Sequence, residues 1–132
     1  TEFLKLIFLV KWVNLSQDSM DYFLDIGASS WQKKYVNTAV SLWLIAKTNK
    51  KFYPNSFLTK VEALKMAILL FVWDIQTLYS QEIMDVWWSE WFAKYVQYSV
   101  ENKLLSTTNN YFYPNKNITR YEVIQLLKQL SI

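Results

Sequence analysis

The chain has 132 residues, and its 52% hydrophobic and 18% aromatic content supplies ample apolar surface for a folded core, which excludes a disordered protein. It contains no cysteine and no histidine, so disulfides, zinc–thiolate sites and the usual general base are excluded, and we expect no metal and no other cofactor. The net charge of +3 comes from scattered residues and not from a massed basic patch, so we expect no nucleic acid among its partners.

The first predicted element is a helix over about residues 2–13. It is apolar almost all round, so we expect it to be covered on several sides, either by a preceding repeat segment or by a second copy of the chain. Neither its apolar run at 6–10 nor a later one at 66–73 approaches the roughly 20 residues that a membrane-spanning helix needs. The first run also lacks a small-residue cleavage site. We therefore predict neither membrane insertion nor a signal peptide here.

A second helix is predicted over about 29–43, after a linker at 14–24. Residues 22–24, and 82–84 in the later linker, are expected to form a short extra turn or helix. A polar stretch at 47–51 and a proline-containing turn sequence at 52–55 follow it. The helix is predicted because apolar residues recur at the spacing of one helical face: Trp31, Tyr35, Val36, Ala39 and Val40.

A third helix is predicted from Thr59 to about residue 73. Thr59 and Glu62 have the spacing of a capping box, in which the threonine oxygen accepts from the amide of the third helical residue and the glutamate accepts from the threonine amide. Since capping accounts for both side chains, we assign them a structural role and not a catalytic one.

The rest of the chain repeats what precedes it, at a constant offset of 60 residues. Residues 25–70 can be laid over 85–130 without a gap, so helices are predicted at about 89–103 and 119–130, after a linker at 74–84. Each unit is too small to bury its own apolar face, and neighbouring units therefore share a core.

These elements predict one all-α domain of helix-loop-helix repeats over residues 1–132. We divide it into the tail of repeat one with its linker (1–20), repeat two (21–80) and repeat three (81–132). Because the opening segment matches the end of a later unit, with Glu2 and Lys5 on Glu62 and Lys65, we expect repeat one to be truncated.

The order of motifs in repeats two and three resembles the S-layer homology repeat. The resemblance implies three repeats packed as a pseudo-threefold helical spindle. It is carried in repeat three by Asp85-Val86, Trp91, Phe112-Tyr113-Pro114-Asn115 and Ile118-Thr119-Arg120-Tyr121-Glu122, and in repeat two by Asp25-Ile26, Trp31, Phe52-Tyr53-Pro54-Asn55 and Leu58-Thr59-Lys60-Val61-Glu62.

The same resemblance implies a secreted bacterial surface protein at the cell wall, with a non-catalytic anchoring role. Its partner would be an anionic, pyruvylated-type cell-wall polysaccharide held in grooves between repeats. The alternative is a structural or protein-interaction module of an envelope assembly, which keeps the fold and has lost glycan binding. We predict no enzyme activity, since the sequence has no phosphate-binding glycine loop, no nucleophile elbow and no carboxylate pair whose spacing predicts a catalytic cleft.

Two cations stand at the position where, by the resemblance, an arginine pairs with the acidic group of the sugar. Arg120 would pair with it through a planar guanidinium, which makes two parallel hydrogen bonds to a carboxylate. Lys60 stands at the same place in repeat two, where it keeps the charge and loses the fork. For both residues the alternative is a helix first-turn side chain that points to water or bridges to a nearby acid.

Two aromatic and two acidic residues complete the candidate ligand-binding set. Trp31 and Trp91 would each offer an aromatic face to a sugar ring, although their spacing suits a buried helix stripe equally well. Asp25 and Asp85 would contact the ligand or, in a structural role, accept amide hydrogen bonds before the following helix.

Glycine is scarce where the family usually has it. The chain has one glycine, Gly27, whose counterpart is Trp87, and Trp43 stands at another position that the family gives to glycine. One hypothesis is that the source organism reads as glycine a stop codon that was translated here as tryptophan. The alternative is ordinary divergence.

Overall fold

The computed structural model describes residues 2–18, 20–27, 31–46, 50–53, 55–76 and 83–131, and these hold five helices and no strand. The predicted all-α class is confirmed. The chain forms two units, Thr1–Ser56 and Phe57–Ile132, so the boundary falls between the two helices of repeat two. The single domain with its repeat boundaries, and the spindle arrangement of the repeats, stay predictions.

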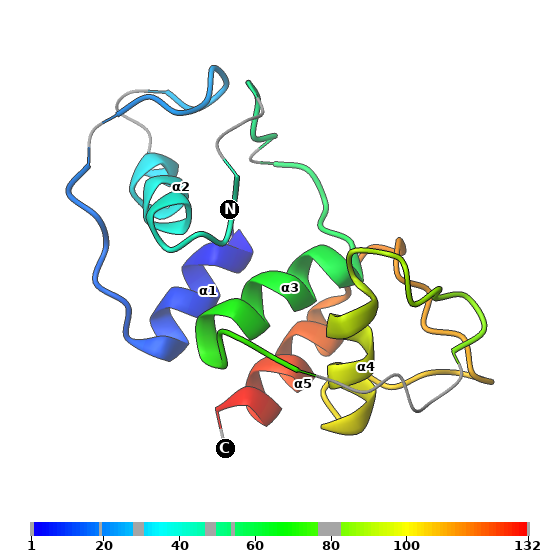
Figure 1. The fold of residues 1–132 in the computed structure, drawn as a ribbon. Helices are drawn as coiled ribbons and strands as arrows, with labels where there is room; N and C mark the ends of the chain where they lie inside the picture. The colour runs from blue at the N-terminus through cyan, green and yellow to red at the C-terminus, as the bar shows by residue number, and fades with distance from the viewer. Residues whose placement is uncertain are drawn as a thin grey trace. The chain divides into compact units, whose positions relative to one another are not determined.

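The first unit pairs α1 (Glu2–Lys11) with α2 (Gln32–Ser41), which lie against each other (Figure 1). One stripe of α1 is buried at the helical spacing i, i+1, i+4, i+5. Leu9, on α1, and Trp12, just after it, are 72% and 90% exposed, so this chain by itself leaves that side open; its cover by a preceding repeat segment or a second copy stays a prediction. The buried stripe consists of Phe3, Leu4, Ile7 and Phe8.

Two polar residues of α2 are buried and tie the preceding linker to the helix. The amide nitrogen of Asn37 donates to the carbonyls of Asp18 and Met20, at 2.9 Å each. The hydroxyl of Thr38 accepts from the amide of Ser16 at 2.7 Å and donates within its own helix. The helical pattern alone did not single out these residues, because their partners are linker backbone about 20 residues away.

The second unit packs α3 (Lys60–Phe71) against α4 (Ala93–Glu101) and α5 (Arg120–Leu130) (Figure 1). The predicted capping boxes are confirmed at both helix starts. Thr59 accepts from the amide of Glu62 at 3.2 Å and its own amide donates back at 3.0 Å, and the pair in α5 repeats this at 3.1 and 3.0 Å. No helix among the described residues has the length and apolar character needed to cross a membrane.

Helix α4 begins four residues later than predicted, because turns occupy the segment before it. The amide of Glu90 donates to the carbonyl of Trp87, and that of Ala93 donates to the carbonyl of Glu90, both at 3.0 Å. Phe92, at the N-cap position, makes no side-chain capping bond. The predicted short element at 22–24 is a loop that enters a turn; for 82–84 only residues 83 and 84 are described, and they are the same.

A carboxylate clamp recurs in both repeats. Asp25 accepts from the amides of Phe52 and Tyr53 at 2.8 and 2.7 Å, and Asp85 accepts from those of Phe112 and Tyr113 at the same two distances. Tyr53 and Tyr113 both have φ of 58°. Consecutive amides around a left-handed residue form a concave anion site, and in each repeat an aspartate of the chain itself fills it.

The clamp in the first unit gives a prediction for acid stability. Burial raises the pKa of Asp25, but the amides of Phe52 and Tyr53 and the charge of Lys51 together lower it, so that the net pKa lies below the ordinary value. A carboxyl with a lowered folded-state pKa contributes stability that is present above its unfolded pKa of about 3.9 and is lost as the pH falls through the folded value. We expect Asp25→Asn to lower the urea midpoint at neutral pH and to flatten its decline between about pH 5 and 2.

Unfolding followed by circular dichroism across that pH range, with the wild type in parallel, measures both effects. Equal acid dependence of the two proteins would contradict the clamp.

Candidate functional site

A lysine and a tryptophan come together at the same place in each unit. The ammonium of Lys5, on α1, lies 5.5 Å from the ring centroid of Trp31, and that of Lys65, on α3, lies 5.5 Å from that of Trp91. The two pairs are related by the 60-residue offset. We call them the Lys–Trp pairs; each joins the second helix of one repeat to the start of the first helix of the next.

The indoles of the Lys–Trp pairs are half-exposed and held from one side. Trp31 is 49% and Trp91 54% exposed. Each packs edge-on against a tyrosine of the following helix turn, Tyr35 at 5.7 Å and Tyr95 at 6.5 Å between centroids. An indole fixed in this way keeps the rest of its surface open to a ligand while a cation stays beside it. The predicted packing therefore applies to one side of each indole, and contact of the exposed side with a sugar stays a prediction.

Tyr95 adds a buried hydroxyl beside the second pair. It is 5% exposed, and burial followed by the negative charge of Asp74 raises the pKa of Tyr95 above its ordinary value. The hydroxyl therefore stays protonated throughout the physiological range and remains a hydrogen-bond donor.

Lys60 lies inside the second unit and not in an open groove. It is 6% exposed, and its ammonium donates to the carbonyl of Phe112 at 2.5 Å, lies 3.5 Å from a carboxylate oxygen of Glu122 and sits 4.3 Å from the Phe112 ring centroid. Both partners belong to repeat three. Of the two interpretations left open for Lys60, the geometry matches a bridge to a nearby acid.

Arg120, the counterpart of Lys60 and the only arginine of the chain, is exposed in the first turn of α5. Within the described part of the chain, no hydrogen bond, ion pair or ring contact joins it to Lys65 or Trp91. Within the second unit, Arg120 thus stands apart from the Lys–Trp pair. Asp25 and Asp85 are engaged in the two clamps described above.

The repeated clamps, capping boxes and Lys–Trp pairs form one ordered pattern, found twice. The family model of the S-layer homology domain matches the chain at residues 22–64 and 85–124. The chain belongs to the S-layer homology domain family. Domains of this family generally anchor proteins at the cell wall or cell surface, so the chain is associated with the cell surface. No curated protein matches it.

The two matches in this S-layer homology chain contain Asp25 with Trp31 and Asp85 with Trp91, and each extends past the capping-box glutamate of its repeat. Sequence reasoning missed Lys5 and Lys65. Two features of the sequence could have indicated them. Lys65 lies one helical turn after the buried Val61, on the same face of the helix, and Lys5 aligns with Lys65 at the repeat offset of 60 residues.

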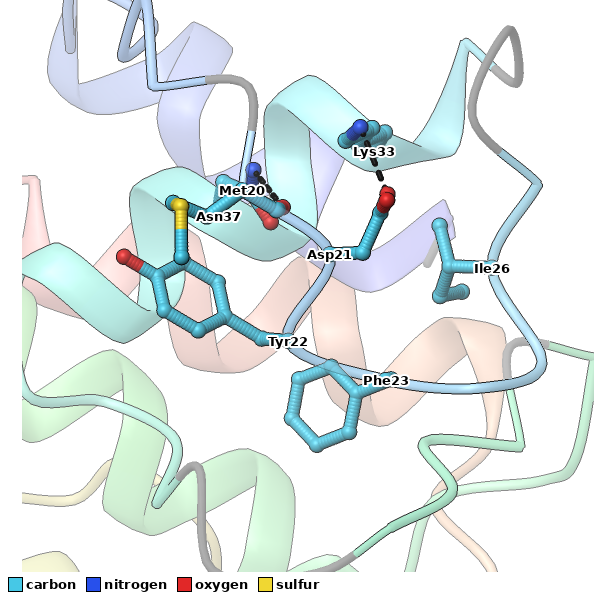
Figure 2. A pocket seen from close by; sticks show the side chains of 7 residues that line it. All are labelled: Met20, Asp21, Tyr22, Phe23, Ile26, Lys33 and Asn37. Atoms are coloured by element: carbon cyan, nitrogen blue, oxygen red, sulfur yellow. Dashed lines mark hydrogen bonds and ion pairs between the residues drawn. The ribbon is translucent and has the colours of Figure 1, made fainter.

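A small hollow in the first unit is lined by residues of the linker and α2, but its polar groups already have partners. Figure 2 shows the Lys33 ammonium reaching Asp21, at 2.7 Å, and the Asn37 amide reaching the backbone of Met20. The hydroxyl of Tyr22 donates to Asp18, and this bond, with desolvation and the charge of Asp18, raises the pKa of Tyr22. These contacts therefore hold the linker against α2.

The described residues contain no cluster of three acidic side chains that could hold a metal ion. The arrangement of this S-layer homology domain offers aromatic faces, ammonium groups and one guanidinium. These groups recognise sugars and anions through packing, charge and hydrogen bonds.

The different surroundings of Lys60 and Arg120 give a matched pair of variants. Lys60→Ala leaves the Glu122 carboxylate and the Phe112 carbonyl without their cation in a buried place, so we expect a loss of about 2–4 kcal/mol in the free energy of unfolding. Arg120→Ala at the equivalent exposed position should change it by less than about 0.5 kcal/mol. Urea unfolding of both variants measures the difference. Equal effects would show that Lys60 is not buried in this way.

Proposed function

We propose that this domain is a non-catalytic anchor that binds an anionic, pyruvylated-type polysaccharide of the bacterial cell wall. The observation that carries the proposal is the Lys–Trp pair, because the same half-exposed indole and ammonium occur twice, at the same distance, 60 residues apart. Membership of the S-layer homology family supports a role at the wall.

The chemistry of the Lys–Trp pair suits an acidic sugar. The C–H face of a pyranose ring packs on an indole. A carboxylate on the same sugar is then attracted to the ammonium, which lies 5.5 Å from the indole centroid in both pairs. In the second unit the buried Tyr95 packs edge-on against the indole and holds it in place for such a contact. Each unit of the chain thus carries one such place.

Arg120 is the second feature that supports an anionic ligand. Its guanidinium is exposed, and its fork geometry matches a carboxylate. We assign it a separate contact to the polymer, apart from the Lys–Trp pairs. Lys60, Asp25 and Asp85 support binding indirectly, since they hold the loops and helices in place.

The competing function is a structural or protein-interaction module of an envelope assembly. It is favoured by the same three residues, because groups that were candidates for ligand contact are engaged in contacts within the chain. The two functions differ in what competes for binding. Soluble wall polysaccharide displaces a glycan anchor and has no effect on a protein-interaction module.

The test is retention of the folded chain on isolated cell-wall sacculi, with depolymerised wall polysaccharide as competitor. We expect wild-type retention that the polysaccharide abolishes and that added salt weakens. Trp91→Ala and Lys65→Ala should each weaken retention several-fold, and the double variant Trp31→Ala/Trp91→Ala should lose it, since stacking and ammonium contacts contribute about 0.5–2 kcal/mol each.

Arg120→Ala is expected to weaken retention without changing stability. Trp88→Ala is the control, because Trp88 is an exposed tryptophan, 71% against 54% for Trp91, and lies outside the Lys–Trp pairs. Retention that the polysaccharide does not compete would favour the protein-interaction module. No retention of a folded sample would refute anchoring.

A further inference from the structure

Three helices of the chain end at a tryptophan in the left-handed backbone region. Trp12 follows α1 with φ of 59°, Trp43 follows α2 with φ of 63°, and Trp73 follows α3 with φ of 77°. A non-glycine residue with positive φ is uncommon, and for a bulky side chain it is a genuine outlier. Three of the seven tryptophans of this chain have this conformation.

Hydrogen bonds at two of these helix ends require the left-handed turn. The amide of Val13 donates to the carbonyl of Phe8 at 2.9 Å, and that of Leu44 to the carbonyl of Ala39 at 3.0 Å. At the third end the bond to the carbonyl of Ile68, at 2.9 Å, comes from the amide of Trp73 itself and does not depend on the φ of Trp73, so position 73 is assigned from its φ of 77° alone. Bonds that reach back five residues close a helix through a left-handed residue, and that position most often belongs to glycine because it has no Cβ to crowd the following carbonyl.

The indoles at these positions gain little packing that would offset the strain. Trp12, Trp43 and Trp73 are 90%, 79% and 55% exposed. The tryptophans of the Lys–Trp pairs contrast with them: Trp31 has an ordinary φ of −59°, and both Trp31 and Trp91 contact a tyrosine and a lysine. The seven tryptophans thus include two with a packing role and three at strained helix ends.

Four of the other five left-handed residues described have local reasons for that conformation. Asn109 and Asn110 belong to the residue type that tolerates it best, and Tyr53 and Tyr113 are held by the carboxylate clamps. Lys103, the counterpart of Trp43, has φ of 58°. The repeat therefore keeps the left-handed backbone at this helix end whatever side chain is present, and a chain with one glycine in 132 residues lacks the residue that fits it best.

We propose that glycine occupies positions 12, 43 and 73 in the protein as its source cell makes it, at codons that one genetic code reads as tryptophan and the source cell reads as glycine. For Trp43 the backbone supports the hypothesis drawn from the sequence. Trp87 does not have a positive φ, and the proposal does not rest on it.

The proposal has a consequence for the surface of the domain and does not depend on the glycan function. The exposed indoles at 12, 43 and 73 would otherwise rank among the largest aromatic surfaces of the chain. With glycine there, Trp31 and Trp91 keep their indoles and their lysines, and the other exposed tryptophans that remain are Trp87 and Trp88.

Peptide mass spectrometry of the protein purified from its source cells tests the proposal, and the tryptic peptides carry internal controls. The peptide of residues 12–33 contains both Trp12 and Trp31, and that of residues 66–94 contains both Trp73 and Trp91. We expect glycine at 12 and tryptophan at 31, glycine at 73 and tryptophan at 91, and glycine at 43 in the peptide of residues 35–47. Tryptophan at 12, 43 or 73 would overturn the proposal.

A recombinant series tests the physical reasoning separately. The triple variant Trp12→Gly/Trp43→Gly/Trp73→Gly should unfold at a higher urea concentration than the chain with tryptophan, although glycine usually destabilises a protein. Trp91→Gly is the control, because it removes a contacting indole at an ordinary position and should lower the midpoint. A triple variant with a lowered midpoint would contradict the assignment of these positions to glycine.

Discussion

The contact on which the rest of the second unit depends is the carboxylate clamp of Asp85 on the amides of Phe112 and Tyr113. It fixes a loop of repeat three, and backbone carbonyls that follow in this loop accept hydrogen bonds from repeat two. The carbonyl of Lys116 accepts from the amide of Lys60 at 2.8 Å, and that of Pro114 accepts from the amide of Val61 at 3.2 Å. The first amides of a helix have no partner within it, so the clamped loop satisfies groups that α3 could not satisfy alone.

The same loop determines where the charges of the unit lie. Phe112 is fully buried, and its carbonyl and ring hold the ammonium of Lys60 beside Glu122. This cation therefore joins two repeats and is not free for a ligand. Further along α3, past the part covered by the loop, Lys65 reaches the half-exposed Trp91. In α3 the first lysine, Lys60, therefore makes contacts that stabilise the fold. The later one, Lys65, lies beside a half-exposed indole, where the proposed ligand would bind.

Local features of the sequence predicted the fold well. The capping boxes at Thr59 and Thr119 involve residues three apart, and the 60-residue repeat carries each assignment from one unit to the next. The candidate site was harder to predict. The partners of Lys60 lie 52 and 62 residues away, and those of Asp25 lie 27 and 28 residues away, so the pattern around each residue could not show which side chains would be buried. Lys5 and Lys65 were missed because the sequence around each lysine does not show its contact with a tryptophan 26 residues further along the chain, and a lysine on a helix is most often solvated.

The most direct measurement of this account is amide hydrogen exchange at the clamped loop, followed residue by residue by NMR. In the wild type the amides of Phe112 and Tyr113 should exchange slowly although they lie outside any helix, and those of Lys60 and Val61 should be protected with them. Asp85→Ala should remove protection at all four amides while the interior of α5 stays protected. Fast exchange of Phe112 and Tyr113 in the wild type, or unchanged protection of Lys60 in the variant, would contradict the account.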